Sequence, residues 1–286
     1  MKHIIRAMRP KSWSKNVFIF IPIVYALELF NSDKMLSVIV AFAGFCFISS
    51  AVYLFNDAYD AEKDAAHPVK KHRPIASGII SKSKAWFLAG LLAAVGVSAM
   101  ASLTLFWGSC ATLIFSVIYL ALNVAYTLSL KHMPIIDCFC IAAGFSLRIY
   151  IGGAASGVAV SDWLFLTVVA ASLFMAFGKR RGEMIMSENA DETRKSLTQY
   201  NLDFLKGVVF ICAALAIVFY SLWTLERGNN MVYTVPLIIF IVSKYLLLIH
   251  EVNSHGDPTT VIFGDKTFLL SCGLYAVLTV LLLYSI

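Results

Sequence analysis

The sequence predicts an all-α protein that crosses a membrane many times, and two observations carry that prediction. Of its 286 residues, 59% are hydrophobic and only 14% are charged, which is far more apolar than a soluble globular chain. The apolar residues also gather into nine runs that are long enough, or nearly so, to cross about 30 Å of hydrocarbon as helices. We therefore expect a polytopic bundle of nine transmembrane helices that forms one domain, residues 1–286.

The nine runs are separated by short polar segments. The first run is the shortest and contains Pro22, so we expect a kink there. The expected spans are Asn16–Phe30, Leu36–Phe55, Trp86–Leu105, Ser109–Leu128, Pro134–Ala155, Asp162–Phe177, Leu205–Leu225, Met231–Ile249 and Thr267–Ser285.

The basic residues predict how the chain is oriented. With the N-terminus in the cytoplasm, only Lys34 and Arg227 fall in outer loops, which is a strong positive-inside asymmetry. The N-terminal segment is basic but has no small-residue cleavage site, so we expect the first helix to be retained. The net charge of +6 is explained by this topology and does not require nucleic acid. The six cysteines lie in apolar runs, which suits small buried side chains better than disulfides or zinc.

Three aspartates follow the second expected span. At roughly 100° per residue, Asp57, Asp60 and Asp64 fall within about 60° of one helical face, so their carboxylates are expected to converge. Hard oxygen ligands suit Mg²⁺, which is commonly completed by water and substrate phosphates. The sequence therefore predicts a magnesium site.

A basic segment comes next, with Lys70, Lys71, His72 and Arg73 bracketed by two prolines that disfavour a helix. Carboxylates for Mg²⁺ beside cations for phosphate indicate a phosphate-ester site. The alternative is a solvated loop whose acidic and basic halves pair with each other.

A second polar island follows the fourth span. Asp137 and Arg148 share one face of the fifth expected helix, where buried charge is costly and indicates function. Eleven residues of helix rise about 16 Å, too far for a direct bond between these two side chains. Each therefore needs another partner.

Several motifs resemble those of one family. The pattern Asn56-Asp57-x-x-Asp60-x-x-x-Asp64 resembles the first aspartate-rich motif of the UbiA-type intramembrane prenyltransferases. The chain is similar in particular to their decaprenyl-phosphate phosphoribosyltransferase branch. The segments that carry this similarity are Arg9-Pro10-Lys11-x-Trp13-x-Lys15-Asn16, His67-Pro68-x-Lys70-x-x-Arg73-Pro74-Ile75-Ala76-Ser77-Gly78, Tyr126-Thr127-x-x-Leu130-Lys131 with Asp137, and Gly178-Lys179-Arg180 with Glu183.

The resemblance covers nearly the whole chain and implies a nine-helix bundle with a lateral lipid entrance and a cytoplasmic cap. It implies a bacterial inner membrane, with the active site on the cytoplasmic side. The implied reaction is Mg²⁺-dependent transfer of 5-phosphoribosyl from phosphoribosyl diphosphate to a polyprenyl phosphate, for arabinan-type cell-wall precursors. The expected partners are these two substrates and the bilayer, with no nucleic acid, and a homo-oligomer is compatible with the sequence.

The same resemblance implies roles for individual residues. Asp57, Asp60 and Asp64 would act in catalysis by holding Mg²⁺-diphosphate. Asn56 would contact a phosphate or ribose oxygen, Asp137 a ribose hydroxyl or the metal, and Arg148 the lipid phosphate. The other expected substrate-binding residues are Lys15, Lys70, Arg73, Tyr126, Lys131, Lys179 and Arg180.

Two other functions stay open. An aromatic prenyltransferase using a prenyl diphosphate usually has a second aspartate-rich motif, whereas the second island here offers Asp137 with Lys131 nearby. A secondary transporter would place polar residues near the midplane in paired, broken helices. Most polar residues here gather at one membrane face instead, with Arg148 as the exception.

Overall fold

The computed structural model describes residues 2–67, 69–107, 109–186, 197–228, 230–250 and 264–284. Every regular element in these ranges is a helix, so the predicted all-α class is confirmed. Eight of the helical segments there are long and apolar enough to cross a membrane. Their helices are α3 (Ser32–Tyr59), α5 (Lys82–Trp107), α6 (Ala111–Leu128), α7 (Ile136–Ser156), α8 (Asp162–Met186), α9 (Leu202–Arg227), α10 (Val235–His250) and α12 (Lys266–Tyr284).

Short helices precede or join the long ones. The α-helical pieces are α1 (Lys2–Met8), α2 (Ile21–Tyr25) and α4 (Ala61–Ala66). The 3₁₀ pieces are η1 (Pro10–Phe20), η2 (Lys70–His72), η3 (Leu130–His132), η5 (Leu197–Gln199) and η6 (Met231–Thr234), of which η6 leads directly into α10.

The first expected span differs from the prediction, because it is no single long helix. Its place is taken by the 11 residues of η1 and the 5 residues of α2. Pro22 occupies the first turn of α2, where its missing N–H costs nothing. A 3₁₀-helix rises about 2.0 Å per residue against 1.5 Å for an α-helix, so η1 and α2 together still cover about 30 Å. These 16 residues thus reach the thickness of the hydrocarbon layer, and they begin six residues before the expected span Asn16–Phe30.

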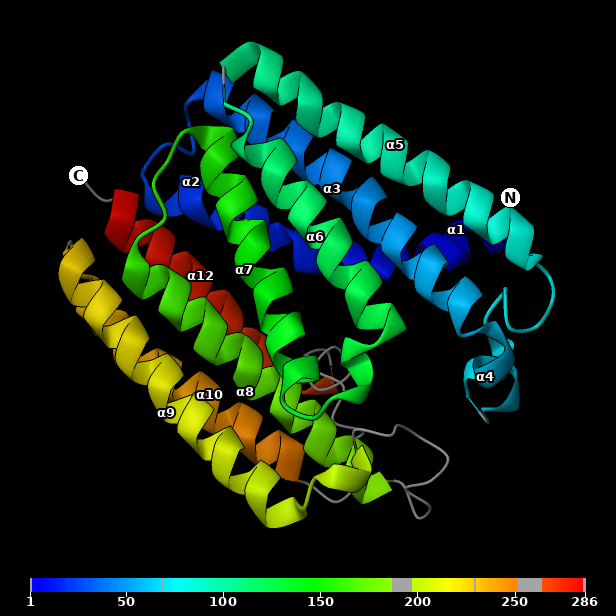
Figure 1. Ribbon diagram of the computed structural model, residues 1–286. Helices are drawn as coiled ribbons and strands as arrows, with labels where there is room; N and C mark the ends of the chain where they lie inside the picture. The colour runs from blue at the N-terminus through cyan, green and yellow to red at the C-terminus, as the bar shows by residue number, and fades with distance from the viewer. Residues whose placement is uncertain are drawn as a thin grey trace. The chain divides into compact units, whose positions relative to one another are not determined.

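The chain divides into two compact units, and the boundary falls inside α7. The first unit comprises residues 1–130 and 147–160. Its main packing pair is α3 and α5, which run side by side (Figure 1). A Cβ on Gly96 would lie 2.6 Å from the carbonyl oxygen of Gly44, so these two glycines allow the backbones to approach closely. The core beside them includes Phe45, Ile48 and Met100.

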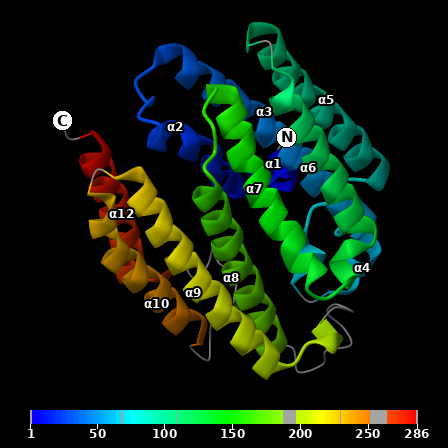
Figure 2. The same cartoon turned by 60° about the vertical axis from the view of Figure 1, so that its left-hand side comes forward.

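The second unit comprises residues 131–146 and 161–286. Its main packing pair is α8 and α9, and α10 packs against both α9 and α12 (Figure 2). The core is aromatic where Phe174, Tyr245 and Phe268 meet. Large apolar side chains such as Leu270 and Ile211 lie exposed on the outer faces, as expected for helices that contact lipid.

Candidate active site

The site in the first unit begins at the end of α3. Asp57 lies in the last turns of α3 and is only 3% exposed. The helix stops at Tyr59, Asp60 adopts a non-helical conformation, and α4 begins at Ala61. Asp64 on α4 is 4% exposed. Two buried carboxylates therefore lie on either side of a helix break. The sequence pattern predicts one continuous helix here and does not indicate the break.

Arg9 neutralises the first of these carboxylates. Its Nη2 donates to both oxygens of Asp57, at 2.6 and 2.8 Å, and its guanidinium lies 4.9 Å from the ring centroid of Tyr53. The backbone of Arg9 is left-handed, with φ of 54°, at the junction between α1 and η1. A residue with a Cβ adopts this conformation at a cost of about 1–2 kcal/mol, and the charged hydrogen bonds to Asp57 offset that cost.

Arg73 joins the two carboxylates to each other. One nitrogen, Nη1, donates to Oδ1 of Asp57 at 3.1 Å and to Oδ2 of Asp64 at 2.6 Å. Lys70 adds a longer ion pair, with its Nζ 4.0 Å from the other oxygen of Asp64. The side chains of Arg9 and Arg73 are 28% and 29% exposed, whereas those of the aspartates are 3% and 5% exposed. The cations thus face the open side of buried acids.

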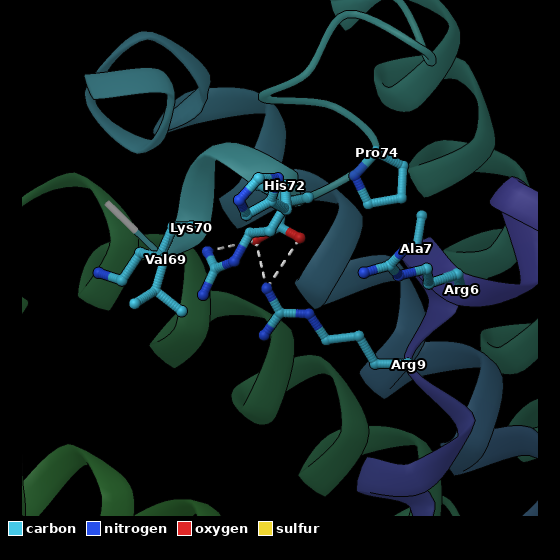
Figure 3. Close-up of a pocket in the computed structure, with 9 residues that line it drawn as sticks. Arg6, Ala7, Arg9, Val69, Lys70, His72 and Pro74 are labelled. Atoms are coloured by element: carbon cyan, nitrogen blue, oxygen red, sulfur yellow. Dashed lines mark hydrogen bonds and ion pairs between the residues drawn. The ribbon is translucent and has the colours of Figure 1, made fainter. Parts of the chain in front are cut away.

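A cavity of about 290 Å³ opens over this cluster (Figure 3). Figure 3 shows Arg9 reaching into it from one side, with Lys70 and His72 across from it and Arg6 on the wall formed by α1. The lining residues are Arg6, Ala7, Arg9, Asp57, Val69, Lys70, His72, Arg73 and Pro74. Four cationic side chains line the cavity with Asp57, and two of them, Lys70 and Arg73, also pair with Asp64. Positive charge is in excess over the two carboxylates, so the cavity suits a multiply charged anion of modest size.

The predicted magnesium ligands, Asp57, Asp60 and Asp64, do not form a ready-made metal site. Among the described residues, no three His, Cys, Asp or Glu side chains are grouped so that they could hold a metal together. Asp57 and Asp64 instead share one nitrogen, Nη1 of Arg73, which donates to one oxygen of each. Carboxylates are donors that Mg²⁺ prefers, so Asp57 and Asp64 would hold the ion once Arg9 and Arg73 move to other acceptors. The role predicted for Asp60 stays a prediction.

Other predicted residues of the first unit lie near or away from this cluster. The side chain of Asn56 accepts a hydrogen bond from Thr127 at 3.3 Å, which ties the end of α3 to the end of α6. Lys15 and Tyr126 are half-buried and do not line the cavity. The roles predicted for these three residues were not tested by the structure and stay predictions.

The second unit holds a separate polar network around Asp137, which is fully buried. Arg180 donates from Nε to Oδ2 of Asp137 and from Nη1 to Glu183, both at 2.6 Å. The hydroxyl of Tyr200 donates to the other oxygen of Asp137 at 3.1 Å and accepts a hydrogen bond from the amide of Ile135. Burial raises the pKa of Tyr200, so the hydroxyl stays protonated. Both oxygens of Asp137 thus already have partners.

This network corrects the sequence interpretation of the second island. The sequence indicates a single carboxylate, Asp137, in this island, whereas Arg180 pairs with both Asp137 and Glu183 in the structure. Lys131 in η3 is buried and Lys179 on α8 is half-buried. The substrate contacts predicted for Asp137, Lys131, Lys179 and Arg180 stay predictions.

Arg148 has its own partners in the first unit, as its burial requires. Its Nε donates to Asn16 at 2.9 Å and its Nη2 to the hydroxyl of Tyr119 at 3.2 Å. The guanidinium also lies 4.9 and 5.0 Å from the ring centroids of Phe45 and Tyr119, where cation–π attraction contributes. The prediction that Asp137 and Arg148 each have a separate partner is confirmed. The predicted contact of Arg148 with a lipid phosphate stays a prediction.

Sequence reasoning missed Arg6 and Tyr200 entirely. It named Arg9, His72 and Glu183 only within motifs and gave them no individual role. A usable signal existed for Arg9, because a buried Asp57 must have a cationic or hydrogen-bonding partner. No periodicity connects residue 9 to residue 57, however, so the partner could not be named.

The described chain is all-helical, with apolar spans and two acidic clusters that are each bridged by an arginine. The model of the UbiA prenyltransferase family matches residues 17–263. The chain therefore belongs to that family and is a multi-pass membrane protein.

Two of the similar proteins carry the name of a transferase. The chain is 36% identical to the decaprenyl-phosphate phosphoribosyltransferase of Mycolicibacterium smegmatis, over 92% of this chain and 86% of that one. It is 34% identical to the protein of the same name from Corynebacterium glutamicum, over 92% and 81% of the two chains. Among solved structures, the UbiA homolog from Archaeoglobus fulgidus bound to GPP and Mg²⁺ has a TM-score of 0.77. It is 14% identical, and the match covers 99% of this chain and 100% of that one, which establishes the shared fold.

Proposed function

We propose that the protein transfers the 5-phosphoribosyl group from phosphoribosyl diphosphate to a polyprenyl phosphate of the decaprenyl type. The observation that carries the proposal is the cavity in which four cations, Arg6, Arg9, Lys70 and Arg73, surround the carboxylate of Asp57. The donor carries a 5-phosphate and a diphosphate, and such a ligand needs more positive charge than a prenyl diphosphate does. The names of the relatives that match over 92% of the chain support the same reaction.

In this reaction a phosphate oxygen of the lipid attacks the anomeric carbon of the sugar. The bond from that carbon to the diphosphate oxygen breaks, and diphosphate leaves with the bonding electrons. The lipid phosphate is already anionic, so no general base is needed. The protein contributes by neutralising charge and by aligning a lipid-borne nucleophile with a water-soluble donor.

The residues of the first cluster divide this work. Lys70, Arg73 and Arg9 would hold phosphate oxygens, because their side chains face the open side of the cavity. Asp57 and Asp64 would hold Mg²⁺, with Asp60 as the third predicted ligand. When bound, the metal would neutralise the leaving diphosphate.

The rival reaction is prenyl transfer from a prenyl diphosphate to an aromatic acceptor. Glu183 beside Asp137 makes the second cluster more acidic than the sequence interpretation allowed. Arg180 nevertheless takes one oxygen of each carboxylate. It is 2% exposed, against 29% for Arg73, so it has no open side to turn to and the pair does not open for a second metal. The donor with a sugar phosphate is therefore favoured. A transporter has no comparable support, because the family is one of transferases.

The cellular setting is part of the proposal. Basic residues gather at one set of span ends, which supports a cytoplasmic side for the N-terminus and the donor cavity. The named relatives are bacterial proteins, which supports a bacterial inner-membrane location. Phosphoribosyl diphosphate is water-soluble, so it would reach the cavity from the cytoplasm. A role in arabinan-type cell-wall precursors is consistent with the named relatives, and a homo-oligomer stays compatible.

The test uses the purified full-length protein in detergent. Labelled phosphoribosyl diphosphate is supplied with decaprenyl phosphate and Mg²⁺, and lipid-linked label and released diphosphate are measured together. Both should form in equal amounts, and Asp57→Asn should lose them while keeping its elution profile. Transfer from geranyl diphosphate to 4-hydroxybenzoate, with no diphosphate released from the sugar donor, would overturn the proposal.

A further inference from the structure

The arginines of the first cluster occupy the groups that a metal would use. Nη2 of Arg9 binds both oxygens of Asp57, and Nη1 of Arg73 lies between Asp57 and Asp64. A divalent cation cannot enter this position while both guanidinium groups remain. Moving the guanidinium groups off the carboxylates is also costly unless other acceptors are present, because guanidinium groups in a partly buried site need hydrogen-bond acceptors.

A diphosphate offers the acceptors that the arginines would need after leaving the carboxylates. Phosphate oxygens take bidentate arginine hydrogen bonds as readily as carboxylates do. Arg9 and Arg73 are both more than a quarter exposed toward the cavity, so their side chains can swing to a ligand there. Asp57 and Asp64 are buried and cannot follow.

From this geometry we propose that Arg9 and Arg73 make metal binding conditional on a diphosphate. The metal and the diphosphate enter as one complex: the arginines pass from the carboxylates to phosphate oxygens, and the metal takes the oxygens that they release. The free metal alone binds poorly, because the arginines compete with it. The inference deepens the proposed function, on which it rests for the identity of the donor.

The competition has a simple quantitative form. If the arginine-free state is a minor fraction of the ligand-free protein, the apparent metal affinity falls by that fraction. Removing either arginine raises the fraction and hence the affinity for metal without diphosphate. The same substitution reduces the increase in metal affinity that diphosphate causes, because one arginine that would bind the phosphate oxygens is lost. These opposite effects separate the exchange from a merely structural role.

The experiment measures protein-bound Mn²⁺, which replaces Mg²⁺ at carboxylate sites, by equilibrium dialysis and electron paramagnetic resonance. The full-length protein is compared with Arg9→Gln and Arg73→Gln, with and without inorganic pyrophosphate. The matched control is Lys82→Gln, which removes a cation from the exposed pair with Glu62 in the same unit. Arg9→Lys and Arg73→Lys serve if a glutamine variant does not fold.

We expect pyrophosphate to strengthen Mn²⁺ binding by the unchanged protein at least about tenfold. Each arginine variant should bind Mn²⁺ alone more tightly and gain less from pyrophosphate, and the control should match the unchanged protein. Adding Asp57→Asn to Arg9→Gln should abolish the binding, which places the ion at the cluster. Tight binding of Mn²⁺ alone by the unchanged protein, or no gain in the arginine variants, would overturn the inference. Neither sugar donor nor lipid is present, so failure here is distinct from failure of the proposed reaction.

Discussion

The buried ion pair of the second unit gives the sharpest prediction about stability. The side chain of Arg180 is 2% exposed and that of Asp137 is 0% exposed, and their atoms lie 2.6 Å apart. Arg180→Met keeps the length and the apolar stem of the side chain but leaves Asp137 without its cation. Breaking a buried pair by removing one partner costs about 3–5 kcal/mol. We expect a fall of roughly 10 °C in the midpoint of unfolding.

The assay is thermal unfolding in detergent, followed by the loss of the monodisperse peak on size-exclusion chromatography. A second variant, Arg180→Met with Asp137→Leu, removes both charges and should recover much of the loss, because an apolar pair leaves no orphaned charge. Lys34→Met is the matched control, since it breaks an equally short but solvated pair with Glu28 and should change the midpoint little. An Arg180→Met variant as stable as the unchanged protein would refute the structural role and favour the predicted substrate contact.

Three further predictions concern single positions. Gly152→Ala would place a Cβ 1.9 Å from the carbonyl oxygen of Ile19, so folded yield should collapse, whereas Gly90→Ala meets no atom within 4 Å and should be tolerated. Tyr200→Phe leaves the amide of Ile135 and an oxygen of the buried Asp137 short of a partner and should cost about 1–3 kcal/mol in thermal unfolding. Hydrogen bonds from the start of α12 and from Lys244 lower the pKa of Asp265 below its ordinary 3.8. The stability that Asp265 adds is therefore present above pH 3.8, and its difference from Asp265→Asn in unfolding scans should shrink as the pH falls through the lower folded value.

Hydropathy predicted the long spans because a membrane helix must satisfy its backbone internally and cover itself with apolar side chains. It failed at the first span, because apolar content does not distinguish a 3₁₀ segment from an α-helix. Helical periodicity placed Asp57 and Asp64 on one face but could not show that the helix breaks at Asp60. The single-domain prediction stays a prediction.

Partners brought from distant segments were beyond the sequence. Asn16 meets Arg148 across 132 positions, and Arg9 meets Asp57 across 48. Burial of a charge predicts that a partner exists, and the structure supplies a neutral amide in one case and an arginine in the other. Which residue becomes the partner depends on how η1 packs against α3 and α7, and local sequence patterns do not predict that packing.

Each unit places one arginine between two carboxylates, yet the two arrangements serve different ends. Arg73 is 29% exposed and borders a cavity, so a phosphate bound there can replace its carboxylate partners. Arg180 is 2% exposed, and leaving Asp137 would strand a charge in a medium that solvates it poorly. Ligand exchange therefore belongs to the cluster at Asp57. The cluster at Asp137 fixes the start of α7, where Ile135 holds a left-handed backbone with its amide bound to Tyr200.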